Sequence, residues 1–196
     1  YLTERVEKRD QPFFLYVPFN AVHGPLNKPP RYAELDVRSA MLKCMDDAVG
    51  RIVKAVDTQG FKENTLVIFT NDNGPVLEEM SKPYRGAKNT TYEGGVRVPC
   101  VMRWPGHTKP GSSNDGMMFV ADFFSTFVKL AGGSLKQERP LDAHDMTGML
   151  FDGAPSPRSE IIFEVSGSVR TPTIRSGDYK LMGDLLYNVI QDPSEQ

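Results

Sequence analysis

Three polar segments of the chain carry side chains whose types and spacing could do chemistry. His23 precedes a Gly-Pro turn, and an imidazole held there can act as a general acid or bind an anion. Asp72 and Asn73 follow an apolar run and offer two hard oxygen ligands, which suit Ca²⁺ or Mg²⁺ better than Zn²⁺. Arg85 and Lys88 lie in a glycine-containing loop, where both cations could bind an oxyanion.

Each segment taken alone also has an interpretation without chemistry. Asn, Asp and Gly favour the turn that ends a strand, so Asp72 and Asn73 by themselves favour an Asx turn. A single histidine in a loop is more often a surface residue, and the segment around Lys88 equally fits a solvated polar loop. The functional interpretation must therefore come from the three segments together.

The composition is that of an ordinary globular protein and excludes several function classes. The 196 residues include 23 Lys and Arg against 25 Asp and Glu, a formal net charge of −2, so the basic excess of a nucleic-acid binder is absent. No apolar run approaches the roughly 18 residues that a membrane-spanning helix needs. Two cysteines are too few for a disulfide scaffold. We therefore expect no nucleic-acid partner and no membrane span.

Apolar runs and helical spacing predict an α/β fold in the first part of the chain. Residues 13–17 and 65–70 are continuous apolar runs typical of buried strands, and 96–104 is a third strand candidate. Between the first two runs, apolar residues recur every three or four positions over 31–60, which predicts an amphipathic helix. A second helix is predicted over 117–130. The strand–helix–strand order indicates a mixed, largely parallel sheet flanked by helices.

The last part of the chain differs in kind. Short apolar runs separated by glycine-containing turns predict a small antiparallel sheet. These runs occupy residues 161–165, 171–175, 179–182 and 185–189. A segment rich in Pro and Gly precedes them and indicates a linker. We therefore expect an α/β domain over residues 1–153 and a small antiparallel β subdomain over 154–196.

Four motifs follow one another along the chain in a distinctive order. They are His-Gly-Pro-Leu from residue 23, Thr-Asn-Asp-Asn-Gly-Pro from residue 70, Arg-Gly-x-Lys-x-Thr-Thr-Tyr-Glu-Gly-Gly from residue 85, and Arg-Trp-Pro-Gly-His from residue 103. Leu-Tyr-Asn and Asp-Pro-Ser-Glu complete the pattern near residue 190. In this order the motifs resemble the sulfatase family, the formylglycine-dependent, arylsulfatase-like hydrolases of the alkaline phosphatase superfamily.

The resemblance implies a role for each candidate residue. Asp72 and Asn73 match the later half of the family's calcium site, which holds one divalent ion against the sulfate oxygens, with Mg²⁺ as the alternative ion. Lys88 matches a lysine that contacts the sulfate, and Arg85 in the same loop is expected to help bind the substrate. His23 matches a histidine on the leaving-group side of the ester, as proton donor or sulfate ligand. Such groups would stabilise the negative charge that develops during ester cleavage.

The Asn at position 73 favours a sulfate ester over a phosphate ester as substrate. Phosphodiesterases and phosphonate hydrolases of the same superfamily usually place His there, which suits a zinc-like second metal. The expected substrate is a sulfated glycan or a small aryl or alkyl sulfate. Two alternatives stay open: a phosphodiesterase or phosphonate hydrolase of this superfamily, and a non-catalytic remnant that keeps an anion-binding pocket.

The resemblance leads us to expect a nucleophile motif, and neither cysteine of the sequence lies in one. The family's nucleophile lies in Cys/Ser-x-Pro-x-Arg and is oxidised to formylglycine, whose hydrate attacks sulfur, but neither Cys44 nor Cys100 lies in such a motif. The aspartate pair that completes the calcium site is also absent. We therefore expect the chain to be the C-terminal half of a sulfatase, inactive by itself, with the formylglycine in the missing N-terminal half.

Two further expectations follow from this interpretation. The chain would hold the later half of the catalytic sheet, and a truncated sheet predicts an unpaired apolar edge near residues 13–17. By resemblance, the complete enzyme is exported, to the periplasm, the extracellular space or the lysosome. The sequence defines neither the oligomeric state nor the individual substrate.

Overall fold

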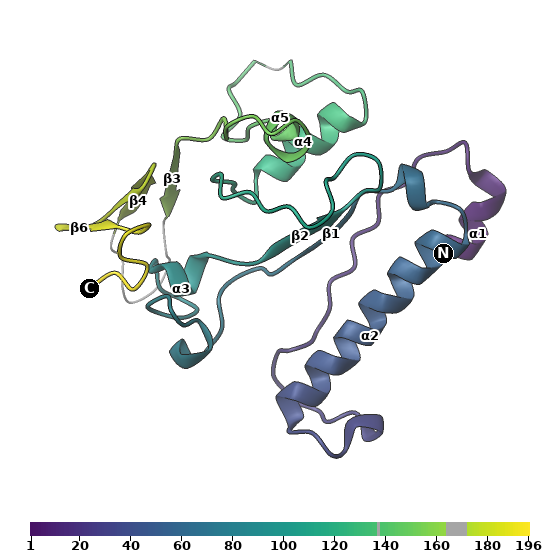
Figure 1. Cartoon of the computed structure of the whole chain (residues 1–196), viewed down its shortest axis with the longest axis horizontal. Helices are drawn as coiled ribbons and strands as arrows, with labels where there is room; N and C mark the ends of the chain where they lie inside the picture. The colour runs from purple at the N-terminus through teal and green to yellow at the C-terminus, as the bar shows by residue number, and fades with distance from the viewer. Residues whose placement is uncertain (137, 164–171) are drawn as a thin grey trace. The chain divides into compact units, whose positions relative to one another are not determined.

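The longest element of the chain is α2 (Val37–Thr58), a helix of 22 residues (Figure 1). The computed structural model describes residues 1–136, 138–163 and 172–196. The chain divides into two compact units: Tyr1–Val67 with Arg103–Gly106, and Ile68–Met102 with His107–Gln196. The expected domain boundary between residues 153 and 154 stays a prediction.

Capping residues set the limits of α2. Asp36 precedes the first turn, and its Oδ1 accepts hydrogen bonds from the amides of Arg38 (3.0 Å) and Ser39 (3.1 Å). Gly60 follows the last turn with φ +78°, a left-handed conformation that favours glycine. The helix predicted over residues 31–60 is therefore confirmed, with a later start. Its buried residues are Ala40, Met41 and Val56.

Short helical turns complete the first unit. They are α1 (Leu2–Arg5) and the 3-10 turns η1 (Val6–Lys8), η2 (Pro30–Tyr32) and η3 (Lys62–Asn64). Residues 103 and 104 are hydrogen-bonded to α2 and η3. The Arg103 guanidinium contacts both carboxylate oxygens of Asp57, at 2.8 and 3.0 Å, and Trp104 Nε1 donates to the carbonyl of Glu63 at 3.1 Å.

The buried strand predicted over residues 13–17 is wrong. The segment has no regular secondary structure, and the side chains of Phe14 and Tyr16 are 73% and 76% exposed. A strand needs a neighbour to pair its backbone groups, and no strand in the described part of the chain pairs with this segment. Its apolar side chains are exposed, but the unpaired strand edge predicted there is absent, because the segment forms no strand.

Two strands form the sheet that leads to the candidate site. β1 (Val67–Thr70) pairs with β2 (Cys100–Arg103), as Figure 1 shows. The strand predicted over 65–70 is confirmed, whereas that predicted over 96–104 shortens at its start, because Pro99 lacks an amide donor. Within the described residues, the sheet of the first part of the chain consists of these two strands. Their apolar side chains are half-buried or exposed, not buried.

Four short helical segments lie between β1 and the C-terminal sheet along the chain. They are η4 (Glu78–Met80), α3 (Glu93–Val96), α4 (Asp122–Leu130) and α5 (Thr147–Phe151). The helix predicted over 117–130 is confirmed only from Asp122. Its carboxylate accepts a hydrogen bond from the amide of Phe119 at 2.7 Å, which fixes the chain before the first turn. No helix among the described residues combines the length and the apolar character needed to cross a membrane.

A buried ion pair joins α4 to the segment before the C-terminal sheet. Arg158 Nε and NH2 lie 2.7 and 2.6 Å from the two carboxylate oxygens of Asp122, whose side chain is fully buried. The amide of His144 donates to the same carboxylate at 2.8 Å, and Arg158 also donates to the carbonyl of Asp142. Three separate segments therefore converge on one carboxylate.

The four-stranded antiparallel sheet predicted for the C-terminal part is confirmed. Its strands lie in chain order: β3 (Glu160–Phe163), β4 (Thr173–Ser176), β5 (Tyr179–Met182) and β6 (Leu185–Asn188). Gly177 (φ +55°) and Gly183 (φ +58°) begin the two tight turns, where left-handed backbone matches the twist of the strands. Residues 164, 165 and 171, which were expected in strands, lie outside the described residues.

Replacing Asp122 with Asn should lower the free energy of unfolding by about 3–5 kcal/mol, because the change leaves the Arg158 charge buried without its partner. Urea unfolding at pH 7 measures the effect. Asp142→Asn is the matched control, since the Asp142 side chain is exposed and should change stability by no more than about 0.5 kcal/mol. Equal effects of the two variants would contradict a structural role for the pair.

The same comparison has a defined pH dependence. Burial alone raises the pKa of the Asp122 carboxyl, but the hydrogen bonds from Arg158, His144 and Phe119 outweigh burial, so the pKa lies below its ordinary value. The stabilisation is therefore present above the unfolded-state pKa of about 3.9 and is lost as pH falls through the lower pKa of the folded protein. The difference in free energy of unfolding between wild type and Asp122→Asn should therefore become smaller in acid.

Candidate functional site

The first candidate group lies in the loop that leaves β1, residues 71–75, here called the Asp72 loop. Thr70 ends the strand, and its hydroxyl donates to the carbonyl of Pro99 at 3.0 Å, next to the start of β2. The side chain of Asp72 is exposed and that of Asn73 is half-buried. Across the described part of the chain, neither side chain has a hydrogen-bond or ion-pair partner. Both oxygen ligands are therefore available at the carboxyl end of a strand, where α/β sheets bind ligands.

Lys88 lies in the second group, residues 84–95, here called the Lys88 loop. Two backbone hydrogen bonds join it to the Asp72 loop: the Lys88 amide donates to the Pro75 carbonyl at 2.8 Å, and the Gly74 amide donates to the Gly95 carbonyl at 2.9 Å. Lys88 is half-buried, and among the described residues its ammonium group has no partner. The structure thus brings the predicted metal ligands and the predicted sulfate-binding lysine into adjoining loops.

Glycine is required where the two loops meet. A Cβ atom built on Gly74 would collide with the carbonyl oxygen of Gly94, and one built on Gly94 would collide with that of Gly86. The amide of Gly94 also donates to the carbonyl of Arg85 at 2.8 Å. The Gly-Gly pair of the third sequence motif therefore has a physical explanation: only glycine permits this close approach of backbones.

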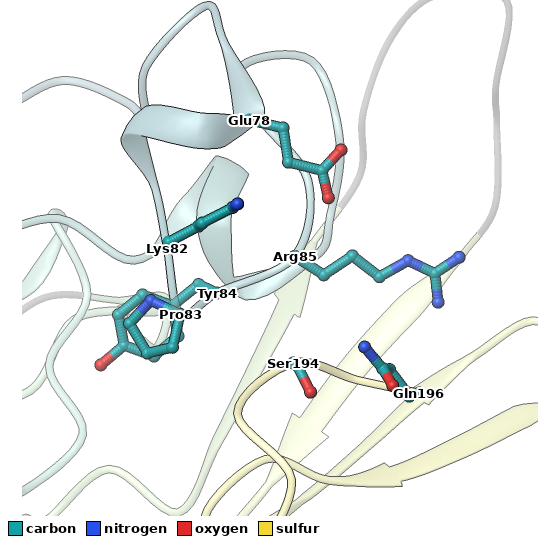
Figure 2. A pocket seen from close by; sticks show the side chains of 7 residues that line it. All are labelled: Glu78, Lys82, Pro83, Tyr84, Arg85, Ser194 and Gln196. Carbon is teal, nitrogen blue, oxygen red and sulfur yellow. The ribbon is translucent and has the colours of Figure 1, made fainter.

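Arg85 contacts the C-terminal segment. Its guanidinium lies 4.3 Å from the ring centroid of Tyr92 and donates to the Glu195 carbonyl at 2.7 Å. It also lines a pocket of about 540 Å³, in which it extends toward the side formed by Ser194 and Gln196 (Figure 2). The remaining lining residues are Glu78, Lys82, Pro83 and Tyr84. These contacts hold the Arg85 side chain against Tyr92 and the C-terminal segment. Its role toward a substrate stays a prediction.

His23 belongs to the first compact unit, whereas the other candidates belong to the second. It is exposed, its amide donates to the Asn20 carbonyl at 3.0 Å, and its Nδ1 lies 2.8 Å from the carbonyl of Gly24. A carbonyl can only accept a hydrogen bond, so we assign the hydrogen to Nδ1. Nε2 is then the ring nitrogen that remains available to a ligand.

The donor set at the Asp72 loop fits a hard cation. Ca²⁺ takes six to eight oxygen ligands, and a carboxylate followed directly by an amide oxygen supplies two of them from one exposed loop. No group of three or more His, Cys, Asp or Glu side chains suited to a metal occurs among the described residues. Asp72 and Asn73 therefore fit as two of the oxygen ligands of a calcium or magnesium site.

Sequence reasoning missed a buried ionic cluster behind the Lys88 loop. Lys180 on β5 is fully buried, and its Nζ lies 2.7 Å from Glu93 Oε1 and 2.9 Å from Glu195 Oε1. The alternation of residues 179–182 fits a strand in either register, so the sequence does not reveal which face turns inward. The structure places Lys180 and Met182 inward.

Comparisons with known proteins agree with the motifs. Residues 1–134 match the family described as Sulfatase. Human arylsulfatase A is 37% identical over 188 residues, covering 89% of this chain and 36% of the human protein. Rat steryl-sulfatase is 34% identical over 168 residues, covering 79% of this chain and 29% of the rat protein. The chain thus spans about a third of the length of these curated relatives.

Solved structures give the same assignment. The crystal structure of the PsFucS1 sulfatase from a Pseudoalteromonas species covers 100% of this chain with a TM-score of 0.83 and 30% identity, over 46% of that structure's length. This likeness confirms the expected α/β class, with its small antiparallel sheet at the C-terminal end. Together with the family match over residues 1–134, it confirms the resemblance drawn from the motifs: the chain belongs to the sulfatase family.

Proposed function

We propose that the chain contributes the metal-binding and sulfate-binding residues of a sulfuric ester hydrolase. The observation that carries the proposal is the pair of backbone hydrogen bonds, Lys88 to Pro75 and Gly74 to Gly95, that joins the two loops. They hold two oxygen ligands and one ammonium group in adjoining loops, and no other described residue pairs with these groups. A sulfate group carries its charge on several oxygens, so a cation and a lysine side by side suit it.

In this proposal Asp72 and Asn73 hold a divalent cation, Ca²⁺ rather than Mg²⁺, through their side-chain oxygens. The bound cation would supply electrostatic stabilisation of the sulfate oxygens. Asp72 supplies the negative charge that retains the cation, and Asn73 supplies a neutral oxygen. Lys88 donates hydrogen bonds to the sulfate from the neighbouring loop, and Arg85 assists substrate binding from the same loop.

His23 acts at the leaving group. Since Nδ1 is engaged with the Gly24 carbonyl, Nε2 is the atom that would carry a proton to the departing oxygen. Protonation at that oxygen turns a poor leaving group into an alcohol or phenol as the S–O bond breaks. With its one hydrogen on Nδ1, a neutral ring has no proton on Nε2 to donate. The proposal therefore requires His23 to be protonated when the ester is cleaved.

The nucleophile is proposed to be a formylglycine contributed by residues outside these 196. Neither cysteine lies in Cys-x-Pro-x-Arg, and the one match to Ser-x-Pro-x-Arg, residues 81–85, has a buried serine whose hydroxyl lies 2.7 to 3.1 Å from three backbone carbonyls. We call the polypeptide that carries both parts the full-length enzyme, and we propose that the 196 residues alone do not hydrolyse sulfate esters. The substrate class is a sulfated glycan or a small aryl or alkyl sulfate, and the enzyme is exported. The sulfatase family match favours this function over a phosphodiesterase or phosphonate hydrolase.

Lys88→Ala should lower the turnover of an aryl sulfate by the full-length enzyme by about 10²-fold or more, because it removes a donor to the charge of the transition state. Steady-state kinetics on a chromogenic aryl sulfate measures the effect. The matched control is Lys129→Ala, since Lys129 is an exposed lysine in the last turn of α4. A Lys88→Ala rate close to wild type, or equal loss in both variants, would rule out the assigned role.

Asp72→Asn should raise the calcium concentration needed for half-maximal turnover by about tenfold or more, because calcium affinity depends on the number of charged ligands. Calorimetric titration of the metal-free full-length enzyme with Ca²⁺ provides a second readout without substrate. Asp115→Asn serves as control, since Asp115 is exposed and lies outside both loops. Unchanged calcium binding in Asp72→Asn would remove Asp72 from the metal site, and a non-catalytic remnant would bind no calcium at all.

A further inference from the structure

We infer that Lys180 is a positioning residue for the sulfate site: it holds the Lys88 loop in the place where Lys88 adjoins the metal ligands. The inference rests on the function proposed above and extends it to a residue on the C-terminal sheet. Lys180 lies on β5, outside both loops. The hydrogen bonds and ion pairs of its ammonium group involve neither the Asp72 loop nor the Lys88 side chain.

The ammonium group of Lys180 is completely satisfied. It has three N–H donors, and three acceptors surround it: Glu93 Oε1 at 2.7 Å, Glu195 Oε1 at 2.9 Å and the carbonyl of Thr91 at 2.9 Å. Lys180 and Glu195 are fully buried, and Glu93 is 1% exposed. A buried cation with full coordination has little freedom, so its acceptors are fixed relative to β5.

Two of these three acceptors belong to the Lys88 loop itself. Thr91 and Glu93 lie at its C-terminal end, where α3 begins. The amide of Glu93 also donates to Glu195 Oε2 at 2.6 Å, so Glu195 binds both the backbone of the loop and Lys180. Arg175 on β4 adds a second cation, 3.3 Å from Glu93 Oε2. The C-terminal sheet thus holds the end of the loop through these buried charged groups and through a hydrogen bond of 2.9 Å between the hydroxyls of Thr91 and Thr173.

From Glu93 the connection to the site is short and passes through the backbone. Gly94 and Gly95 follow directly, and they bind Arg85 and Gly74 through the amide and carbonyl bonds described above. The close packing of Gly74 on Gly94 leaves no space for a small shift to be absorbed. If α3 moves, the Asp72 loop and the Lys88 loop must separate or move together.

The energetics give Lys180 a larger effect than its single charge implies. Removing the cation would leave the carboxylates of Glu93 and Glu195 buried near each other. Among the described residues, Arg175 and the exposed Arg97 would remain paired with Glu93. An uncompensated buried charge is strongly unfavourable, and the cheapest relief is to expose it to water. Glu93 begins α3, so exposing its side chain would displace Gly94 and Gly95, which connect the Lys88 loop to the Asp72 loop.

A role in overall stability alone is the competing explanation, and the chain offers a matched control for it. Arg158 is another buried cation of the same unit, 9% exposed and paired with the fully buried Asp122. None of its contacts reaches the Asp72 loop or the Lys88 loop. Arg158→Met therefore destroys a comparable ion pair without touching the site.

The experiment compares Lys180→Met with Arg158→Met in the full-length enzyme, well below the unfolding temperature of either. The first readout is hydrogen exchange at the amides of Lys88 and Gly74, the two donors that join the loops. Only Lys180→Met should speed their exchange, by about tenfold or more. The second readout is kinetic: only Lys180→Met should lower kcat, by about 10²-fold if the loops shift by an ångström, with a smaller change in KM.

Equal exchange at Lys88 and Gly74 in the two variants, with equal kcat, would overturn the inference. If Lys180→Met does not fold, Glu195→Gln tests the same connection with a smaller perturbation, since the ion pair between Lys180 and Glu93 remains. Faster exchange at Lys88 in Glu195→Gln supports the inference, and unchanged exchange overturns it.

The outcome also separates this inference from the proposed function. Loss of turnover in Lys88→Ala together with wild-type kcat and exchange in Lys180→Met would leave the function standing and remove only the role of Lys180. Wild-type turnover in Lys88→Ala would instead remove the proposed role of the Lys88 loop, whatever the exchange at Gly74 shows.

Discussion

The close approach of two loop backbones is the constraint on which the candidate site depends. The Gly74 amide donates to the Gly95 carbonyl, and the Lys88 amide donates to the Pro75 carbonyl. These hydrogen bonds form only because Gly74 and Gly94 have no Cβ atom. This contact decides that the oxygens of the Asp72 loop and the ammonium of the Lys88 loop lie in adjoining segments. In the proposed function, a cation and an ammonium group held this way would face one sulfate group together.

The rest of the second unit holds this contact in place by buried charge more than by apolar packing. The apolar side chains of β1 and β2 are half-buried or exposed, whereas Lys180, Glu93, Glu195 and Asp122 are among the most buried side chains of the chain. Buried ion pairs add little net stability, because desolvation offsets their attraction. Their directional hydrogen bonds do fix geometry, and geometry is what an active-site loop needs.

The sequence predicted the parts of this molecule that local pattern determines. Helical spacing located α2, and glycines at 177 and 183 located the turns of the C-terminal sheet. The apolar run at residues 13–17 failed as a strand because pairing depends on a neighbour, which composition does not reveal. The helix expected from residue 117 begins at Asp122 because a long-range ion pair with Arg158 fixes that carboxylate.

The candidate site was likewise predictable only in part from the sequence. The types and order of His23, Asp72, Asn73 and Lys88 gave the chemistry, but the contact between loops and the role of Lys180 came only from three-dimensional structure. The central claim is that Asp72 and Lys88 act on one sulfate group, and a double-mutant cycle on kcat/KM of the full-length enzyme tests it most directly. We predict that Asp72→Asn and Lys88→Ala together cost far less than the sum of their separate effects, with a coupling of about 1 kcal/mol or more. Additive losses would contradict the claim.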